Sequence, residues 1–322
     1  MNGKIEALYL YPVKSCAGVR VEQAELSHHG LIGDRRWMIV DEKGLMMTQR
    51  KLPALALIQP SFEHGDTRGQ LQLRYNPTAN IHSNIAGQDE DADNSCTVRY
   101  DLDQVVHVSI WQDKVPAFKA DAHCNQWLNR VLNTQQKLSL VYYNPDQTRH
   151  PGEPQRFGDA NRHFADAAPY LVCNHASLTA LNQQLAKRGE PQVSMLNFRP
   201  NIVVGGVDAF SEHGFSHIQI SEAGRNNTDT LWRTGLYLVD HCQRCAIITI
   251  DPQTAQKYPN AVPFKALTAL NPMPSNLKAP AFGINAVLKT IDACALTDAL
   301  SNVEHLSDTQ IPIHCGQSIR WR

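Results

Sequence analysis

The chain has 322 residues, a formal net charge of -1 at pH 7 and a hydrophobic content of 42%. This length allows two domains of ordinary size, and the composition is that of a globular protein rather than a disordered one. The near-neutral charge favours no nucleic-acid partner, and no apolar run reaches the ~20 residues that a membrane-spanning helix requires. The first residues show no signal-peptide pattern, so we expect a cytoplasmic protein.

The first part of the chain predicts mostly β-structure, in short apolar or alternating runs. The expected strands are residues 5–11, 37–40, 55–58, 71–75 and 105–111. Residues 41–44 (Asp-Glu-Lys-Gly) indicate a hairpin turn after the second of these strands. Short strands separated by turn signals favour a barrel or a sandwich. An acidic run at residues 89–93 is expected to be a solvated surface insertion rather than a cation site.

The second half of the chain predicts a mixture of helices and strands. Apolar residues recur at helical spacing over residues 122–133, and a further helix is expected to start at Ser177, which is a suitable N-cap. Residues 144–162 form a long irregular loop, a kind of segment that is often a functional lid or mobile. The expected strands are residues 138–143, 202–204, 217–220, 236–239 and 246–250. Strands therefore dominate this half as well.

The most informative of the eight cysteines are the pair in Cys242-Gln243-Arg244-Cys245. A structural zinc site normally needs two such pairs, and a thioredoxin-like dithiol needs a helix after the motif, where a strand is expected here. Two interpretations of the pair remain. The cysteines can be structural residues of the core, or one of them can be a reactive thiolate beside Arg244, because a guanidinium favours the thiolate and also binds anions. A soft thiolate beside an anion-binding group suits a metal carried by a phosphorylated organic cofactor.

Two polar segments in the first part of the chain could point cations at such a cofactor. Lys14 and Ser15 lie in a bend after the first expected strand and could face a phosphate, although a lone lysine is more often simply exposed. Arg35 and Arg36 begin the next strand on opposite faces, so one of them can face the interior and needs an anionic partner there. That partner could be the cofactor or simply Asp34.

A third polar segment precedes the strand expected at residues 202–204. Pro200 is expected to keep Arg199 extended, so that Arg199 and Asn201 project on one side with guanidinium and amide donors. These donors suit a pterin-like heterocycle with a phosphate. The alternative is a strand-entry turn whose polar side chains cap the local backbone.

These segments, taken in order, resemble the MOSC proteins, the molybdenum cofactor sulfurase C-terminal type. The resemblance rests on the runs YPVKSCAG, GDRRW, VSIWQDKVPAFKAD, NFRPNIVVGG, CQRCAIITIDPQT and AFGIN. It implies a mainly β fold with α+β elements: an N-terminal β-barrel domain packed against a MOSC β-barrel domain with peripheral helices. We place the first domain at residues 1–122 and the second at residues 123–322.

The resemblance to amidoxime-reducing members implies a molybdenum-cofactor oxidoreductase that reduces N-hydroxylated compounds by oxygen-atom transfer at molybdenum. It implies Cys245 as the metal ligand and catalytic residue. It also implies that the cofactor, molybdopterin with molybdenum, contacts Lys14, Ser15, Arg35, Arg199, Asn201 and Arg244. A plant-type iron–sulfur site needs four clustered cysteines, which the chain does not show, so the electrons would come from an external ferredoxin- or flavodoxin-like reductase.

The same resemblance allows a function of a different class. MOSC domains also occur joined to pyridoxal-phosphate-dependent desulfurases, which gives the family an association with pyridoxal phosphate. This chain could then be a sulfur carrier or a cofactor-delivery protein, and a metal-free binding module is a further alternative. Asp166 is a candidate general acid by position, or else an aspartate that caps a loop. Ala167 and Ala168 stand where relatives often carry a hydroxyl group, which puts one phosphate contact in doubt.

Overall fold

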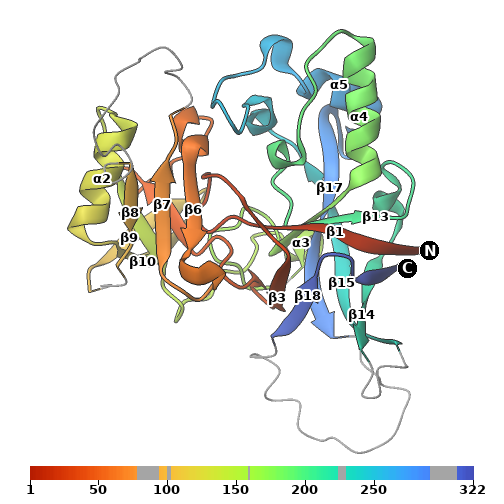
Figure 1. Ribbon diagram of the computed structural model, residues 1–322, viewed down its shortest axis with the longest axis horizontal. Coiled ribbons are helices and arrows are strands. Elements are labelled where there is room, and N and C mark those ends of the chain that lie inside the picture. The colour runs from red at the N-terminus through yellow and green to blue at the C-terminus, as the bar shows by residue number, and fades with distance from the viewer. Residues whose placement is uncertain (78–93, 100–102, 159, 224–229, 291–309) are drawn as a thin grey trace, which may run out of the picture.

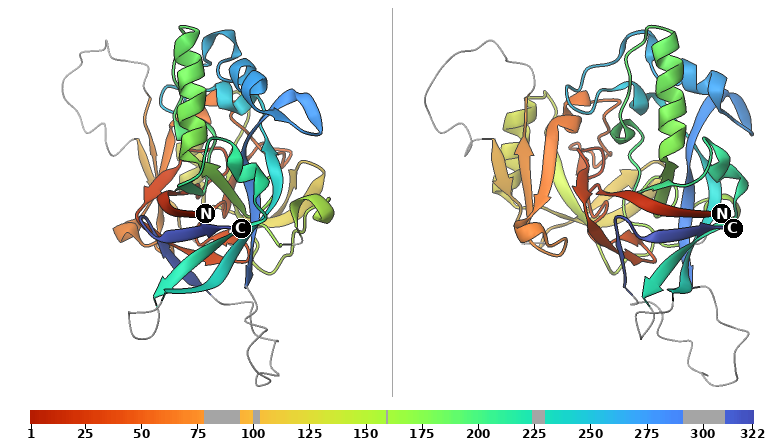
Figure 2. Two further views of the ribbon diagram at one scale, coloured as in Figure 1. Left: turned by 90° about the vertical axis from the view of Figure 1, so that its right-hand side faces the viewer. Right: turned by 45° about the vertical axis from the view of Figure 1, so that its right-hand side comes forward.

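The computed structural model describes the whole chain except residues 78–93, 100–102, 159, 224–229 and 291–309. Most of the described elements are strands, and they gather in two parts that lie side by side (Figures 1 and 2). The expected mainly β fold with peripheral helices is confirmed. The acidic run at residues 89–93 lies outside the described residues.

The larger part is a closed barrel of seven strands, whose ring is completed where β17 pairs with β12. Apolar residues from these strands, such as Leu8, Val172 and Ile220, fill its core. Two short strands, β2 and β16, pair with β1 and β17 outside the ring. In order around the barrel the strands are β12 (Tyr170–Asn174), β13 (Ile202–Gly205), β1 (Asn2–Leu10), β19 (Ser318–Trp321), β14 (His217–Ala223), β15 (Thr230–Gln243) and β17 (Asn276–Thr290), with β2 at Val19–Val21 and β16 at Pro272–Met273.

The smaller part contains a four-stranded and a three-stranded sheet with one helix, α2 (Ala122–Leu132). The helix begins after Asp121, whose side chain accepts a hydrogen bond from the backbone of Cys124, and it buries the apolar face expected from the sequence. The four-stranded sheet has the order β5 (Trp37–Val40), β11 (Ser139–Tyr143), β10 (Asp113–Lys119) and β9 (Val105–Ile110), and the other sheet has β6 (Ile58–Phe62), β7 (Leu71–Tyr75) and β8 (Ser95–Thr97).

The two ends of the chain meet in the larger barrel. β1 pairs with β13 on one side and with β19 on the other, so the first and last strands are neighbours (Figures 1 and 2). A separate three-stranded sheet joins β18 (Ile311–His314) to β3 (Gln23–Ser27) and β4 (Gly30–Leu31). The first strand thus belongs to the larger barrel, while α2 and β11 pack with the smaller part. The domain limits at residue 122 stay a prediction.

The larger barrel carries the remaining helices. Helices α4 and α5 pack on one end of the barrel, with a core that includes Leu181, Leu185 and Leu267 (Figure 1). The N-cap of α4 is Asn174, which accepts a hydrogen bond from the backbone of Ala176, so the expected start at Ser177 is wrong by one turn. The bounds are α3 (Pro154–Phe157), α4 (His175–Lys187), α5 (Phe264–Leu270), and the 3-10 turns η2 (Glu63–Gly65), η3 (Met195–Asn197), η4 (Ser211–Gly214) and η6 (Pro259–Ala261).

Two segments expected as strands are 3-10 turns instead. Residues 53–57 form η1 (Pro53–Leu57), whose first position is a proline that suits a helical start, and strand β6 begins only at Ile58. Residues 246–249 form η5 (Ala246–Thr249), where the Thr249 hydroxyl donates to the carbonyl of Ala246 at 2.8 Å. This local bond favours a turn over an extended backbone although the residues are β-branched. Cys245 therefore sits at the start of a short turn and not in a strand.

Candidate active site

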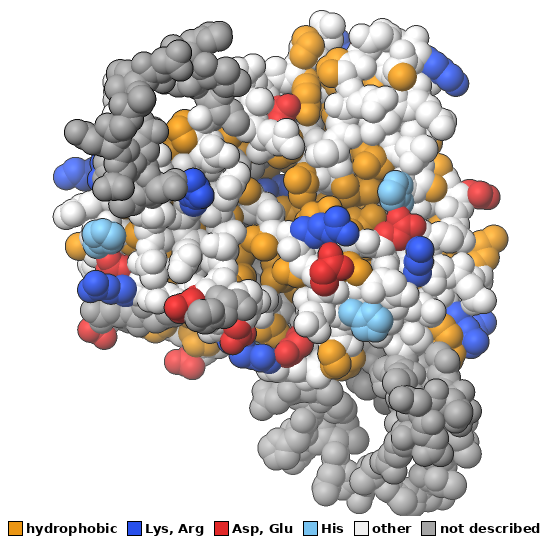
Figure 3. All heavy atoms as spheres, viewed as in Figure 1, with side chains coloured by type: hydrophobic (Ala, Val, Ile, Leu, Met, Phe, Trp, Pro, Cys, Tyr) orange, Lys and Arg blue, Asp and Glu red, His pale blue; other side chains and the backbone are white. Residues whose placement is uncertain are grey.

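One pocket of about 290 Å³ takes its walls from both parts of the molecule. All seven residues predicted from the sequence line it: Lys14, Ser15, Arg35, Arg199, Asn201, Arg244 and Cys245. They come from four segments that are up to 231 positions apart in the chain, so the fold brings the separate motifs together. On the face seen in Figure 3, hydrophobic side chains gather in a hollow between the two parts, with lysine and arginine side chains beside them.

Lys14 and Ser15 lie in the bend after β1. The backbone N–H of Lys14 donates to the carbonyl of Trp37 at 2.8 Å, which ties the bend to the smaller part. The buried ammonium donates to the carbonyl of Phe164 at 2.8 Å and to Oδ1 of Asp166 at 2.6 Å. Burial lowers the pKa of Lys14 to about 8, although Asp166 opposes this shift. Ser15 is buried with a left-handed backbone (φ 68°) that the bend imposes.

Two arginines lie on the same aromatic ring. The guanidinium carbons of Arg35 and Arg199 are 4.6 and 4.2 Å from the centre of the Tyr11 ring. Arg35 pairs with Asp34, as the sequence allowed, and also donates to Oδ1 of Asn201 at 3.1 Å. Arg199 has φ 57°, so the expectation that Pro200 keeps it extended is wrong. The left-handed turn directs Arg199 Nη1 to the carbonyl of Cys16 at 2.6 Å, and the side chain still lines the pocket.

The Cys-Gln-Arg-Cys motif begins with the last two residues of β15 and continues past the end of the strand at the pocket wall. The backbone N–H of Arg244 donates to the carbonyl of Pro280 at 2.8 Å, which fixes the motif to β17. The buried guanidinium donates from Nη1 to the sulfur of Cys242 at 2.9 Å and from Nη2 to the carbonyl of Phe198 at 2.8 Å. Cys245 is exposed and Cys242 is half-buried. The two sulfurs therefore differ: Cys242 orients Arg244, while Cys245 is open to the pocket.

The pocket carries a surplus of positive charge. Six of the described side chains that line it are lysine or arginine, and two are aspartate. Burial lowers the pKa of Arg199 to about 10, which still leaves this guanidinium protonated at neutral pH. Nε of Arg244 is buried with no hydrogen-bond partner among the described atoms. Buried donors need acceptors, so this wall is suited to an anionic ligand with several oxygen or nitrogen acceptors.

Comparison with known proteins decides the family. Residues 2–135 match the MOSC N-terminal beta barrel domain, and residues 159–271 match the MOSC domain. The chain is 30% identical over 301 residues to human mitochondrial amidoxime-reducing component 1, which covers 89% of this chain and 79% of the relative. The chain belongs to the MOSC family. Among further MOSC relatives, the zebrafish mitochondrial amidoxime-reducing component 1 is 30% identical over 259 residues, which cover 78% of this chain and 70% of the relative.

A second kind of relative is a sulfurase. Bovine molybdenum cofactor sulfurase is 26% identical over 264 residues, which cover 79% of this MOSC chain and 27% of that larger protein. Both kinds of relative are named for chemistry connected with molybdenum or amidoximes. Among the helices that the structure describes, none combines the length and apolar character needed to cross a membrane.

The rim of the pocket contains residues that sequence reasoning did not single out. Trp111 occupies the turn between β9 and β10, is 52% exposed and has a left-handed backbone (φ 56°). Its indole N–H donates to Oδ1 of Asp166 at 2.7 Å, and the Arg50 guanidinium lies 4.9 Å from its ring centre. On the same pocket, Arg156 pairs with Asp240 at 3.0 Å. A tryptophan in a tight hairpin turn, where Gly, Asn or Asp is usual, was the signal that could have revealed this rim.

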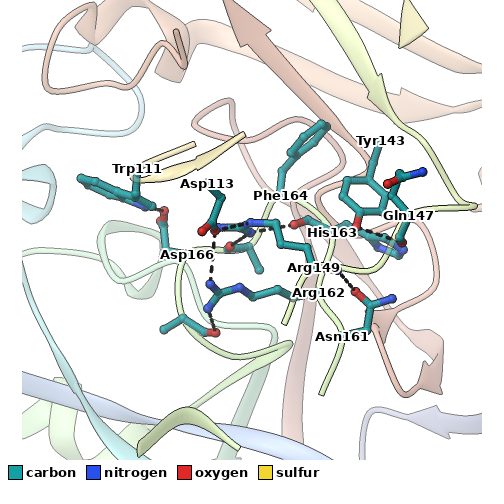
Figure 4. Close-up of polar contacts among 12 residues, drawn as sticks. Trp111, Asp113, Tyr143, Gln147, Arg149, Asn161, Arg162, His163, Phe164 and Asp166 are labelled. Carbon is teal, nitrogen blue, oxygen red and sulfur yellow. Dashed lines mark hydrogen bonds and ion pairs between the residues drawn. The ribbon is translucent and has the colours of Figure 1, made fainter. Parts of the chain in front are cut away.

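A buried network anchors the loop that carries Asp166 (Figure 4). Arg149 donates from Nε to Asp113 at 2.8 Å and from Nη1 to the carbonyls of His163 and Ala165 at 2.9 and 2.8 Å. Arg162 lies 3.7 Å from the same Asp113 carboxylate and donates to the carbonyl of Ala167. The long loop after β11 is therefore tied down around two buried guanidinium groups.

The position of Asp166 argues against its candidate role as a general acid. Loss of some water contacts beside the pocket raises the pKa of Asp166, whose side chain is still 61% exposed, but the Lys14 ammonium and the Trp111 N–H lower the pKa more, so that it lies well below the usual range of a carboxyl group. Asp166 is therefore ionised at neutral pH and cannot supply a proton. Its carboxylate instead positions Lys14 and Trp111.

Proposed function

We propose that the pocket binds a molybdenum cofactor and that the protein reduces N-hydroxylated compounds. The single observation that carries this proposal is the convergence of an exposed thiol, Cys245, and a cationic wall on one pocket. The likeness to amidoxime-reducing components, at 30% identity over most of both chains, supports the same activity class.

The residues of the pocket fit such a group. A phosphate carries negative charge and a pterin offers several acceptor atoms, which match Lys14, Arg35 and Arg199 and the unpartnered Nε of Arg244. Ser15 and Asn201 add a hydroxyl and an amide. Cys245 would be the protein ligand of the metal, since a thiolate is the ligand that a soft metal centre prefers. When bound, the cofactor would supply two-electron chemistry and accept the oxygen of an N–OH group.

The chain's own residues would hold the cofactor and manage protons. Arg244 keeps the Cys245 side of the pocket positive, and Cys242 fixes the direction of the guanidinium. Nζ of Lys14 has a pKa of about 8, so it can gain and lose a proton near neutral pH. Asp166 stays ionised beside it and holds the ammonium in place. Reduction of an N–OH group consumes two protons and two electrons, and we propose that the electrons come from an external ferredoxin- or flavodoxin-like reductase.

The proposal predicts different metal contents for two cysteine variants. The protein is expressed with molybdate in cells that make the cofactor, and molybdenum is measured by elemental analysis. We expect Cys245→Ser to lose most of its molybdenum, because the metal ligand is gone. We expect Cys242→Ser to keep the metal, because its hydroxyl can still accept a hydrogen bond from Arg244. If both variants keep full molybdenum, the ligand assignment is wrong; if the wild type carries none, the cofactor proposal falls.

The sulfurase relative supports a second candidate function, that of a sulfur carrier or cofactor-delivery protein. The exposed Cys245 thiol could equally hold a persulfide. Turnover separates the two candidates: a reductase loaded with molybdenum reduces an amidoxime when an artificial electron donor such as reduced methyl viologen is present, and a carrier does not.

A further inference from the structure

We infer that Trp111 is a substrate-binding platform on which flat, aromatic N-hydroxylated compounds stack at the mouth of the pocket. This inference deepens the proposed function and rests on it for the chemistry of the ligand. It assigns to Trp111 a specificity role: the ring selects for an aromatic group attached to the carbon that bears the N–OH function.

The first observation behind this inference is that the backbone conformation and the solvent exposure of Trp111 are both unfavourable for a tryptophan. Turn residues with positive φ are usually Gly, Asn or Asp, and a bulky side chain there is strained. Trp111 has φ 56° and is a large apolar residue that is 52% exposed. The strained backbone and the exposed apolar surface both oppose folding, and Trp111 belongs to none of the hydrophobic cores of the described residues. Strained residues of this kind are found where a ligand makes use of them.

The second observation is that the ring is held ready at the pocket. Trp111 lines the same pocket as Cys245. Its indole N–H is fixed by Asp166 at 2.7 Å, and Asp166 is in turn fixed by Lys14 at 2.6 Å on the same carboxylate oxygen, Oδ1. Figure 4 shows the indole nitrogen facing Asp166 while the ring extends away from the buried arginine network. The Arg50 guanidinium lies 4.9 Å from the ring centre, which steadies the ring further. A fixed ring loses little freedom when an aromatic ligand stacks on it.

The ligand class follows from this chemistry. An exposed, oriented indole offers an apolar π surface, and aromatic groups gain most from such a surface by stacking. Benzamidoxime and acetamidoxime carry the same N–OH function and differ only in a phenyl against a methyl group. The platform therefore predicts a preference for benzamidoxime over acetamidoxime that depends on the ring of Trp111.

The test measures the ratio of kcat/KM for these two amidoximes, with the molybdenum-loaded protein and reduced methyl viologen as donor. We expect Trp111→Gly to lower the benzamidoxime preference by about two- to tenfold, the factor that one aromatic contact supplies. Trp111→Phe should keep most of the preference, since it retains an aromatic ring, although that ring is smaller and lacks the N–H. Leu277→Ala, a change at an exposed apolar residue that does not line the pocket, is the control and should keep the ratio of the wild type. An unchanged ratio in Trp111→Gly overturns the inference.

A binding readout keeps the inference independent of turnover. With ¹⁵N-labelled tryptophan, the indole signal that is missing from the Trp111→Phe variant identifies Trp111. Benzamidoxime should shift this signal, and acetamidoxime should shift it less. If the wild type reduces both amidoximes and the signal does not move, the platform is wrong and the proposed function stands. If neither amidoxime is reduced, the proposed function fails, and the shift still decides for or against the platform.

Discussion

Lys14 shows how one buried cation serves both the fold and the site. Its ammonium bridges the carbonyl of Phe164 and the carboxylate of Asp166, and the latter also receives the Trp111 N–H. A lone lysine in the sequence is usually exposed, but here the bend after β1 turns it inward. Burial disfavours the charged form, so Lys14 loses its proton at a far lower pH than a surface lysine does.

The lowered pKa of Lys14 predicts an alkaline limit to activity. The ammonium is present below the pKa of about 8 and is lost as the pH rises through that value, whereas an ordinary lysine keeps its charge to about 10.5. We therefore expect amidoxime reduction to fall as the pH rises through about 8, because a neutral amine binds a phosphate weakly and has one proton fewer to give. The pH profile of kcat/KM checks this.

Lys14→Arg is the matched variant for this prediction. A guanidinium keeps its positive charge throughout the alkaline range, so the fall near pH 8 should disappear or move to a higher pH. Molybdenum is measured at each pH, which separates loss of the cofactor from loss of proton delivery. A wild-type profile that stays level through pH 9 contradicts the assignment to Lys14.

At the scale of elements, the loop between β11 and β12 is held by buried arginines where the sequence favoured a lid or a mobile segment. Its Pro, Gly and charged residues are typical of an exposed connection, but Arg149 and Arg162 turn inward to Asp113 and to loop carbonyls. Such long-range bonds leave no periodic pattern, because each partner is supplied by a different segment. These bonds hold the described loop residues around Arg149 and Arg162, and the loop carries Asp166 to the pocket.

This anchoring predicts a large effect of Arg149→Met. The change leaves two buried carbonyls without their donor, which costs about 1–3 kcal/mol of unfolding free energy for each, whereas the Asp113 carboxylate is 36% exposed and stays partly hydrated. Urea denaturation measures this loss. Arg20→Met is the control: the Arg20 side chain is 59% exposed and lies 3.7 Å from Glu22, so its loss should cost under about 1 kcal/mol. Equal effects of the two variants would show that the loop does not depend on Arg149.

The elements that could be predicted from sequence are those with a strong local signal. The amphipathic pattern of α2 and the alternating runs of β7 and β9 correspond to the structure closely. The 3-10 turn after Cys245 could not be predicted, because its β-branched residues favour a strand, whereas the Thr249 hydroxyl bond and the backbone bonds of the turn favour the turn. The seven predicted pocket residues do line one pocket, whereas their roles toward a cofactor remain proposals.

The rim of the pocket could not be predicted for a different reason. Trp111, Arg50 and Asp166 belong to three separate segments, and although a tryptophan in a tight turn is an unusual local signal, nothing in the sequence shows that the three residues meet. They meet only because the smaller part and the loop after β11 both reach the mouth of the pocket. A motif describes residues that are close in sequence, so it finds the deep wall of a site more readily than a rim assembled from tertiary contacts.

At the scale of the whole molecule, the first and last strands pair with each other within the larger barrel. β1 runs from this barrel directly into the bend that carries Lys14 and Ser15, and β19 is its partner strand. Trp321 in β19 is buried in the barrel core with Phe215 5.1 Å away, ring centre to ring centre. Loosening the last strand should therefore disturb the pocket, although Trp321 does not line it.

Trp321→Ala tests this dependence. Removal of a fully buried tryptophan costs about 3–5 kcal/mol through lost contacts and the cavity left behind, and urea denaturation measures it. Because β1 belongs to the barrel and leads into the pocket, we also expect the variant to retain less molybdenum after purification. Trp321→Phe, which keeps an aromatic ring in the core, should recover most of both properties. Full molybdenum in a Trp321→Ala protein of clearly lowered stability would show that the pocket holds its shape without the packing of Trp321 in the last strand, and that the pocket does not depend on how well this strand is held.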